Sequence, residues 1–233
     1  MLAAPLTLRL PVSLLLAVVG GVACGSDASE RDRRALEPLT PGPDSPVAVD
    51  ENGELLLDEL TDEDARFAVS GISGEWFTYS DGTSPITPPD HTGLPIVDGA
   101  AHVSGTGFSE WGAGLSAYFT SADLSAFDSV VVRVRGNGVI VAEVATPATS
   151  PPEEGGTCMG TGCFGHFARS FPLTDTYQDV VIRFAELAQP SWGQPAQLAL
   201  DGVISLNLTT KVSEGPASID LWVDRLALHA AAP

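Results

Sequence analysis

The chain has few basic residues. Lysine and arginine total 11 against 30 aspartates and glutamates in 233 residues, a formal net charge of −19. A surface this acidic repels nucleic acid and anionic lipid, so neither is an expected partner. Most of these carboxylates favour solubility, and a few are available to hold Ca²⁺. The charge balance therefore fits a solvated extracytoplasmic protein.

Sequence motifs for catalysis are also missing. The chain contains no Gly-x-Ser-x-Gly nucleophile elbow and no HExxH or His-x-x-x-His zinc spacing. Glu153 and Glu154 lie in a segment rich in proline and glycine, where neither carboxylate would be buried enough to act as a general acid. The sequence predicts that the protein is not an enzyme and uses no organic cofactor.

Cysteine is scarce, and the first of the three cysteines, Cys24, is informative. It ends an apolar stretch, residues 14–23, that is shorter than the roughly 20 residues of a transmembrane helix and ends in small residues. A short apolar core with such an exit is typical of a cleaved secretion signal. The layout resembles a bacterial lipoprotein signal, with residues 1–23 removed and Cys24 lipidated. Ordinary secretion and a retained membrane anchor are the alternatives.

The lipoprotein interpretation predicts a location and a domain organisation. We expect a protein of the bacterial cell envelope, anchored to the outer membrane or the cell surface through the lipid alone. A secreted or periplasmic protein is the alternative. Residues 24–53 are predicted to be a disordered acidic tether, because prolines and carboxylates alternate there with too few apolar residues to bury. Residues 54–230 are predicted to form one domain.

The other two cysteines, Cys158 and Cys163, bound a short glycine-rich loop. In an oxidising compartment such a pair predicts a disulfide. A metal site would need further soft ligands, and only His166 is close in sequence. We therefore expect a disulfide that fixes the shape of a loop.

From Leu55 onward, short apolar runs alternate with glycine, proline, aspartate and asparagine, a pattern typical of strands. The predicted strands are Leu55–Leu60, Phe67–Ile72, Glu75–Ser80, Ala101–Gly105, Gly114–Phe119, Ser129–Arg135, Val139–Ala145, His166–Pro172, Gln178–Arg183, Val203–Thr209 and Ser218–Leu228. Gly136-Asn137-Gly138 predicts a hairpin, since these residues tolerate positive φ. One helical turn is expected at Phe184–Ala188. Many short strands with so little helix predict an all-β, jelly-roll β-sandwich.

Four passages in this order resemble the galactose-binding-like jelly rolls, in particular carbohydrate-binding module family 11. They are Leu56–Leu60, Phe108–Leu115 with Leu124–Gly136, Tyr177–Leu187 with Gln189–Gly193, and Ile219–Leu228. The resemblance covers about residues 55–229 and implies a cleft on one sheet face that holds a β-glucan by aromatic stacking and hydrogen bonds.

The resemblance implies two aromatic positions in that cleft. Trp76 or Tyr79 occupies the region of one family tyrosine. Alternation puts Trp76 and Thr78 on one strand face and Phe77 and Tyr79 on the other, so only one of the two candidates can face the cleft. Trp192 stands where the family has a loop aromatic, between a proline and a glycine that favour exposure.

The sequence also departs from the family pattern. Glu110 replaces a tyrosine before the central tryptophan, and the strand expected to present Asp, His and Tyr reads Ile204, Asn207 and Thr210. Asn207 is the polar candidate retained there. These replacements favour an alternative in which the jelly roll has lost its sugar site and serves a structural or protein-interaction role.

Other aromatic and charged residues have a structural and a functional interpretation. Trp111 and Trp222 are predicted to pack in the core. Arg133 is an exposed strand arginine that could also bind a uronic acid. The predicted function is polysaccharide binding, or binding of another envelope component, tested first at Trp192, Tyr79 and Asn207.

Calcium is a second implied ligand, because jelly rolls of this class often hold a structural Ca²⁺ where the first and last strands meet. Asp58 or Glu59, together with Asp224, stands at the matching positions, and hard carboxylate oxygens suit the ion. Alternatively, Asp224 pairs with Arg225 or caps a turn.

Overall fold

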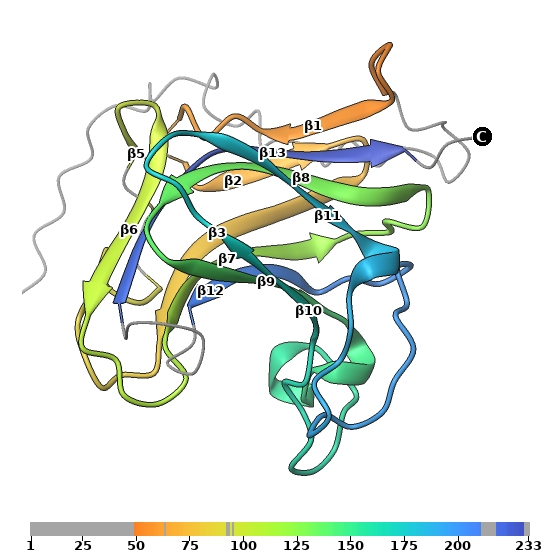
Figure 1. The fold of residues 1–233 in the computed structure, drawn as a ribbon. Helices are drawn as coiled ribbons and strands as arrows, with labels where there is room; N and C mark the ends of the chain where they lie inside the picture. The colour runs from red at the N-terminus through yellow and green to blue at the C-terminus, as the bar shows by residue number, and fades with distance from the viewer. Residues whose placement is uncertain (1–48, 63, 92–93, 95, 211–217, 231–233) are drawn as a thin grey trace, which may run out of the picture. The chain divides into compact units, whose positions relative to one another are not determined.

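The computed structural model describes residues 49–62, 64–91, 94, 96–210 and 218–230. In this part of the chain the strands form two antiparallel sheets that enclose an apolar core (Figure 1). The strands are β1 (Glu54–Asp58), β2 (Arg66–Val69), β3 (Ile72–Ser80), β4 (Ile86–Thr87), β5 (Ile96–Val97), β6 (Ala100–Thr106), β7 (Ala113–Ser121), β8 (Phe127–Gly136), β9 (Val139–Ala145), β10 (Phe167–Pro172), β11 (Gln178–Arg183), β12 (Ser205–Thr210) and β13 (Ser218–Ala230). Three 3₁₀ turns are η1 (Pro147–Thr149), η2 (Pro152–Glu154) and η3 (Phe184–Glu186).

Strands of the seven-stranded sheet run in the order β11-β8-β13-β6-β4, with β1 paired to β13 and β5 paired to β6. Strands of the six-stranded sheet run in the order β10-β9-β12-β7-β3-β2. This arrangement confirms the predicted all-β jelly-roll sandwich. Among the described residues, no helix has the length and apolar character needed to cross a bilayer.

Alternation along the strands builds the core. In β8, Val130, Val132 and Val134 are buried, whereas Arg133 and Arg135 point to the outer face of the seven-stranded sheet. Facing strands of the six-stranded sheet contribute their own inward rows, such as Leu115 in β7 and Leu206 in β12. Each sheet therefore has one face in the core and one outer face.

One predicted strand, Phe67–Ile72, is wrong because it runs across a turn. Ser70 and Gly71 have φ values of 50° and 81°, and β2 and β3 pair on either side of them. Two successive residues with positive φ are the mark of a tight hairpin turn, and glycine accepts that conformation without a steric penalty. The apolar run is therefore two strands of a hairpin.

The hairpin predicted at Gly136-Asn137-Gly138 is also wrong. The turn exists, with φ values of 153° at Gly136 and 87° at Gly138, but β8 belongs to one sheet and β9 to the other. Gly136 is required by space as well as by backbone conformation, since a Cβ there would lie 2.0 Å from the carbonyl oxygen of Asp220. The chain crosses between the sheets at this turn.

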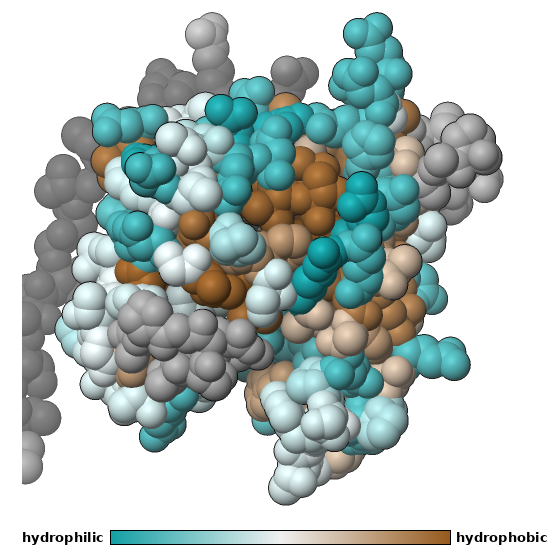
Figure 2. Space-filling model, viewed as in Figure 1, coloured by the Kyte–Doolittle hydropathy of each residue, from teal (hydrophilic) through white to brown (hydrophobic). Residues whose placement is uncertain are grey.

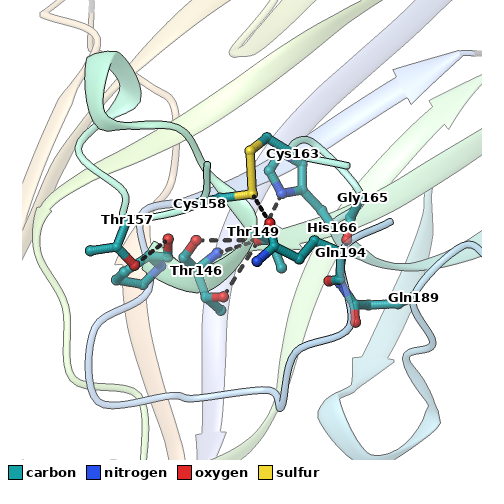
Figure 3. Close-up of a disulfide and its surroundings, with 10 residues drawn as sticks. Thr146, Thr149, Thr157, Cys158, Cys163, Gly165, His166, Gln189 and Gln194 are labelled. Atoms are coloured by element: carbon teal, nitrogen blue, oxygen red, sulfur yellow. Dashed lines mark hydrogen bonds between the residues drawn. A yellow bond between two sulfur atoms is a disulfide. The ribbon is translucent and has the colours of Figure 1, made fainter. Parts of the chain in front are cut away.

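Cys158 and Cys163 form the predicted disulfide, with their Cα atoms 5.7 Å apart (Figure 3). The disulfide lies in a lobe made of residues 146–166 and 187–200, called the disulfide lobe below. Its two segments are joined by hydrogen bonds from Gln194 N to Gly162 O (2.8 Å) and from Gln189 Nε2 to Gly165 O (2.8 Å). The lobe lies below the strands in the view of Figure 1 and is a protrusion at the bottom of the same view in Figure 2.

Reduction of this disulfide is expected to leave the sandwich folded. Closing a six-residue loop contributes only about 2 kcal/mol in the chain-entropy model. The lobe also keeps hydrogen bonds that do not need the disulfide, including the 2.9 Å contact between Thr149 Oγ1 and His166 Nδ1. Thermal unfolding of the Cys158→Ser/Cys163→Ser double variant measures the effect. A fall in stability far above 2 kcal/mol would show that the disulfide supports the sandwich as well as the lobe.

Candidate binding face

Trp76 lies in the core and not in a cleft. Its ring is 3% exposed, packs edge-on against Phe67 at 6.2 Å and donates a hydrogen bond from Nε1 to Asp58 Oδ2 (2.8 Å). A ring in this position cannot stack on a ligand. Of the two aromatic candidates on β3, Tyr79 is therefore the one on the outer face.

Arg133 and Tyr79 lie on opposite outer faces of the sandwich. It lies on the outer face of the seven-stranded sheet and pairs with Asp224, with Arg133 Nε 3.2 Å from Asp224 Oδ2. The core separates this face from the outer face of the six-stranded sheet, which carries Tyr79 and Asn207. Arg133 therefore cannot contribute to a sugar site built on those two residues.

Trp222 is not a core residue, contrary to the sequence prediction. It lies on the outer face of the seven-stranded sheet between its two cross-strand neighbours, His102 and Arg135. The His102 ring stacks on the indole at 3.8 Å, and the Arg135 guanidinium carbon lies 4.1 Å from the indole centre. Because flanking strands supply both partners, the indole faces are occupied by protein groups and leave little aromatic surface for a sugar.

Asn207 lies at the centre of the outer face of the six-stranded sheet. Cross-strand register places it beside Ser116 of β7 and Glu143 of β9, and Phe77 of β3 lies on the far side of Ser116. Ser116 Oγ donates to Asn207 Oδ1 (2.8 Å). Ser116, Asn207 and Glu143 are called the polar row below. Ser116 and Glu143 are almost covered, at 1% and 8% exposed, and Asn207 is half-buried.

Four aromatic rings follow one another beside the polar row, three of them on β3 and β7 and the fourth, Trp111, in the loop before β7. In order they are Trp111, Tyr79, Phe77 and Tyr118, with successive ring centres 5.8, 6.3 and 6.2 Å apart. They are called the aromatic stripe below. Trp111 stacks on Tyr79 and is 45% exposed, so it is a surface residue and not the predicted core residue. Alternation alone places Phe77 on the face of Tyr79, but nothing local in the sequence indicates that Trp111 folds over it.

Tyr79 holds the stripe against the sheet. Its ring crosses Gly114, where a Cβ would lie 2.6 Å from the Tyr79 hydroxyl, so only glycine leaves room for it. The hydroxyl is buried, and among the described residues it lies near Thr209 but makes no hydrogen bond of good geometry. Burial, together with the negative charge of Glu143, raises the pKa of Tyr79 above its ordinary value. The phenol therefore stays neutral, and the ring acts through packing.

Asp81 fixes the loop that carries Trp111. Its Oδ2 accepts hydrogen bonds from the backbone N–H groups of Glu110 and Gly112, both at 3.0 Å, which flank the tryptophan. Its Oδ1 accepts bonds from Thr83 N and Thr83 Oγ1. Desolvation raises the pKa of Asp81, but these four hydrogen bonds outweigh it and lower the pKa to about 2 from the ordinary 3.8.

We expect Asp81→Ala to loosen the Trp111 loop without unfolding the sandwich. The depressed pKa means that the carboxylate supports the loop fully above about pH 4 and loses this role as the pH falls toward 2. Tryptophan fluorescence of the native protein should therefore change between pH 4 and 2, and that component should be missing in the variant. Asp90→Ala, an exposed aspartate bonded to Ser80 Oγ, is the matched control. An acid transition unchanged by Asp81→Ala would contradict the assignment.

Trp192 is exposed, as its sequence context predicts, at 57%. It lies in the disulfide lobe, and no ring contact joins it to Tyr79 or to the rest of the aromatic stripe among the described residues. On β12, the outward positions implied by the family resemblance, Ile204, Asn207 and Thr210, are also partly wrong. Ser205, Asn207 and Thr209 point outward, whereas Thr210 points inward and Ile204 precedes the strand. Only Asn207 of the three predicted positions lies on the binding face.

The predicted calcium ligands do not converge. Both oxygens of Asp58 already accept hydrogen bonds, from Leu60 N (2.7 Å) and from Trp76, and burial raises its pKa. Asp224 pairs with Arg133 and not with Arg225, and Glu59 is exposed. Among the described residues, no three His, Cys, Asp or Glu side chains are grouped for a metal. The predicted ligand side chains are thus engaged with protein groups or exposed in this arrangement, and calcium binding stays a prediction.

Comparisons with known proteins identify the fold. The sequence matches no protein-family model and no curated protein significantly. The structure is similar to the family 11 carbohydrate-binding module of a cellulosomal cellulase from Clostridium thermocellum, with a TM-score of 0.53 and 20% identity over 77% of this chain and 95% of that one. It is also similar to a family 11 module from the same organism in complex with a β-1,3-1,4-mixed-linked tetrasaccharide (TM-score 0.52, 20% identity, 77% and 96% covered). The chain therefore has a β-sandwich fold like that of these modules.

Proposed function

We propose that this protein is a non-catalytic polysaccharide-binding protein of the bacterial envelope, and that the aromatic stripe is its binding surface. The observation that carries the proposal is the continuity of the stripe. The centres of successive rings are no more than 6.3 Å apart on a single outer face, and Trp111 is 45% exposed. Sugar rings present C–H faces that pack against aromatic planes, so such a surface suits an extended glycan.

Polar groups beside the stripe support the same proposal. A bound sugar needs partners for its hydroxyls, and the half-buried amide of Asn207 and the exposed imidazole of His91, whose ring is 5.0 Å from Phe77, are available to supply them. Because one of the structurally similar modules is in complex with a β-1,3-1,4-mixed-linked tetrasaccharide, a β-1,3-1,4-glucan is the first ligand to test.

The test is affinity electrophoresis of the purified full chain carrying Cys24→Ser, which keeps it in solution. Native gels containing β-1,3-1,4-glucan, xylan or mannan are compared with gels lacking polymer, and insoluble peptidoglycan is tested by co-sedimentation. We expect at least one polymer to retard the protein, and Trp111→Ala to abolish the retardation. If no polymer retards or sediments the protein, the proposed function is wrong.

A lipid anchor on Cys24 is part of the proposal, although this residue lies outside the described part of the chain. A lipid would hold the domain at the envelope while it meets a polymer outside. Membrane fractionation of cells tests this: the native protein should sediment with membranes, and Cys24→Ser should appear in the soluble fraction. Native protein found in the soluble fraction would favour ordinary secretion instead.

A structural or protein-interaction role is the second candidate, and one observation favours it. The polar row beside the stripe offers few solvent-accessible polar groups. Ser116 is 1% exposed, and Asn207 already accepts the hydrogen bond of Ser116. A protein with this surface that binds no polymer in the electrophoresis panel would fit the second candidate.

A further inference from the structure

A hollow of about 400 Å³ opens at the end of the aromatic stripe. Tyr118, the last ring of the stripe, forms part of its wall, and Thr120 at the end of β7 and Ala122 just after it continue that wall. Residues 201–204, before β12, form the opposite wall, and Pro147 and Gly155 of the disulfide lobe close the third side. Ligand pockets in proteins have volumes of roughly 300–1,000 Å³, so this hollow is large enough for a small ligand.

The chain itself holds the walls in place. Phe119 N donates to Ile204 O (2.8 Å) and Val203 N donates to Ala122 O (3.2 Å), which extends the β7–β12 pairing beyond the strand ends. On the lobe side, the Tyr118 hydroxyl lies against Gly155, where an added Cβ would be 3.4 Å away. The hollow is therefore bounded by paired backbone on two sides and by the disulfide lobe on the third.

Two carboxylates give the hollow its chemistry. Asp123 Oδ1 accepts hydrogen bonds from Ser125 N (2.9 Å) and Ser125 Oγ (2.5 Å), which hold the side chain and lower its pKa. Asp201 is exposed, and no hydrogen bond or ion pair to another described residue engages its carboxylate. Ionised carboxylates accept strong hydrogen bonds from hydroxyl groups and repel anions. A neutral sugar matches this lining, whereas a uronic acid does not.

We propose that this hollow binds a neutral glycosyl branch of a polysaccharide whose backbone lies on the aromatic stripe. The inference rests on the proposed function and names its substrate class, a branched polymer in preference to a linear one. Tyr118 is the shared element, because its ring belongs to the stripe and also lines the hollow. A backbone sugar packed on Tyr118 would direct a branch past that ring toward Asp123 and Asp201.

The experiment compares polymers that differ only in their branches. Galactomannan is paired with the same polymer debranched by α-galactosidase, arabinoxylan with debranched xylan, and a glucuronate-substituted xylan gives the acidic branch. We expect at least one neutral branched polymer to bind about five-fold tighter or more than its debranched partner, because ionised carboxylates accept strong hydrogen bonds from the hydroxyl groups of the branch. The glucuronate branch should give no such gain.

Two variants locate the effect. Gly202 has no positive φ, and a Cβ there would meet only the Pro147 ring at 3.8 Å, so a side chain can be attached at this position without backbone strain and Gly202→Phe should fill the hollow. It should remove the gain from branching and leave binding of the debranched polymer unchanged. Asp201→Asn should reduce the gain, and Asp175→Asn, which changes an exposed aspartate in the turn between β10 and β11, should not.

The outcomes separate this inference from the proposed function. If branched and debranched polymers bind equally well, or if Gly202→Phe leaves the preference intact, the branch site is wrong while polysaccharide binding stands. If no polymer of either kind binds, the proposed function fails and the branch site with it.

Discussion

Replacement of Trp76 by alanine is expected to destabilise the protein by about 3–5 kcal/mol, the range for removing a buried tryptophan. The indole is 3% exposed and packs against Phe67, which itself packs edge-on against Phe119 at 5.6 Å. The variant also removes the Nε1 hydrogen bond to Asp58, whose carboxylate is partly buried. Both losses act on the region where β1 and β3 meet the core, so they should lower the stability of the whole sandwich.

Urea or thermal unfolding of the full chain measures this effect. Trp76→Phe is the informative second variant, because it keeps an aromatic ring in the core while it removes the hydrogen bond to Asp58 and only part of the indole volume. Trp192→Ala is the control, since an exposed ring should change stability by no more than about 0.5 kcal/mol. A stable Trp76→Ala protein that has lost polysaccharide binding would place Trp76 in the binding site and overturn its assignment to the core.

Replacement of Trp111 by alanine is expected to lower polysaccharide affinity at least about ten-fold, equivalent to 1.4 kcal/mol. The indole is 45% exposed and stacks on Tyr79, so it offers a flat surface already oriented by protein contacts. Asp81 holds its loop through the N–H groups on either side. Because the other indole face is open to solvent, the stability of the fold should change little.

Affinity electrophoresis or calorimetry with the polymer that binds best measures this loss. Trp192→Ala is the matched comparison, since both tryptophans are exposed but only Trp111 belongs to the aromatic stripe. Equal losses from the two variants would extend the binding surface to the disulfide lobe. Loss with Trp192→Ala alone would move the site to the lobe and contradict the proposal for the stripe.

The β3 segment shows what the local sequence pattern can predict and what it cannot. Alternation correctly separates Trp76 and Thr78 from Phe77 and Tyr79, because successive side chains of a strand point to opposite faces. It does not say which pair meets the opposing sheet. That depends on where the core lies, and so the sequence admits Trp76 as a ligand-binding residue although it is buried.

The tryptophans outside β3 also show that local sequence context does not always predict whether a side chain is buried. Sequence context correctly indicates that Trp192 is exposed, since proline and glycine flank it, but predicts Trp111 and Trp222 to be core residues. Trp111 reaches the surface because its loop folds back over Tyr79, 32 residues earlier in the chain. Trp222 lies outward on β13, covered by His102 of β6 and Arg135 of β8. Both environments are made by strands that are distant in sequence.

The sequence by itself determined the all-β class, the approximate places of most strands and the disulfide, because strand alternation, turn residues and a close cysteine pair are local properties. Only the tertiary structure decided that the turn at Gly136–Gly138 crosses between sheets, that Trp76 is buried and that Trp111, Tyr79, Phe77 and Tyr118 form one stripe. These outcomes depend on which strands become neighbours. Strand pairing joins segments far apart in the chain, and their contacts leave no periodic signal in either segment alone.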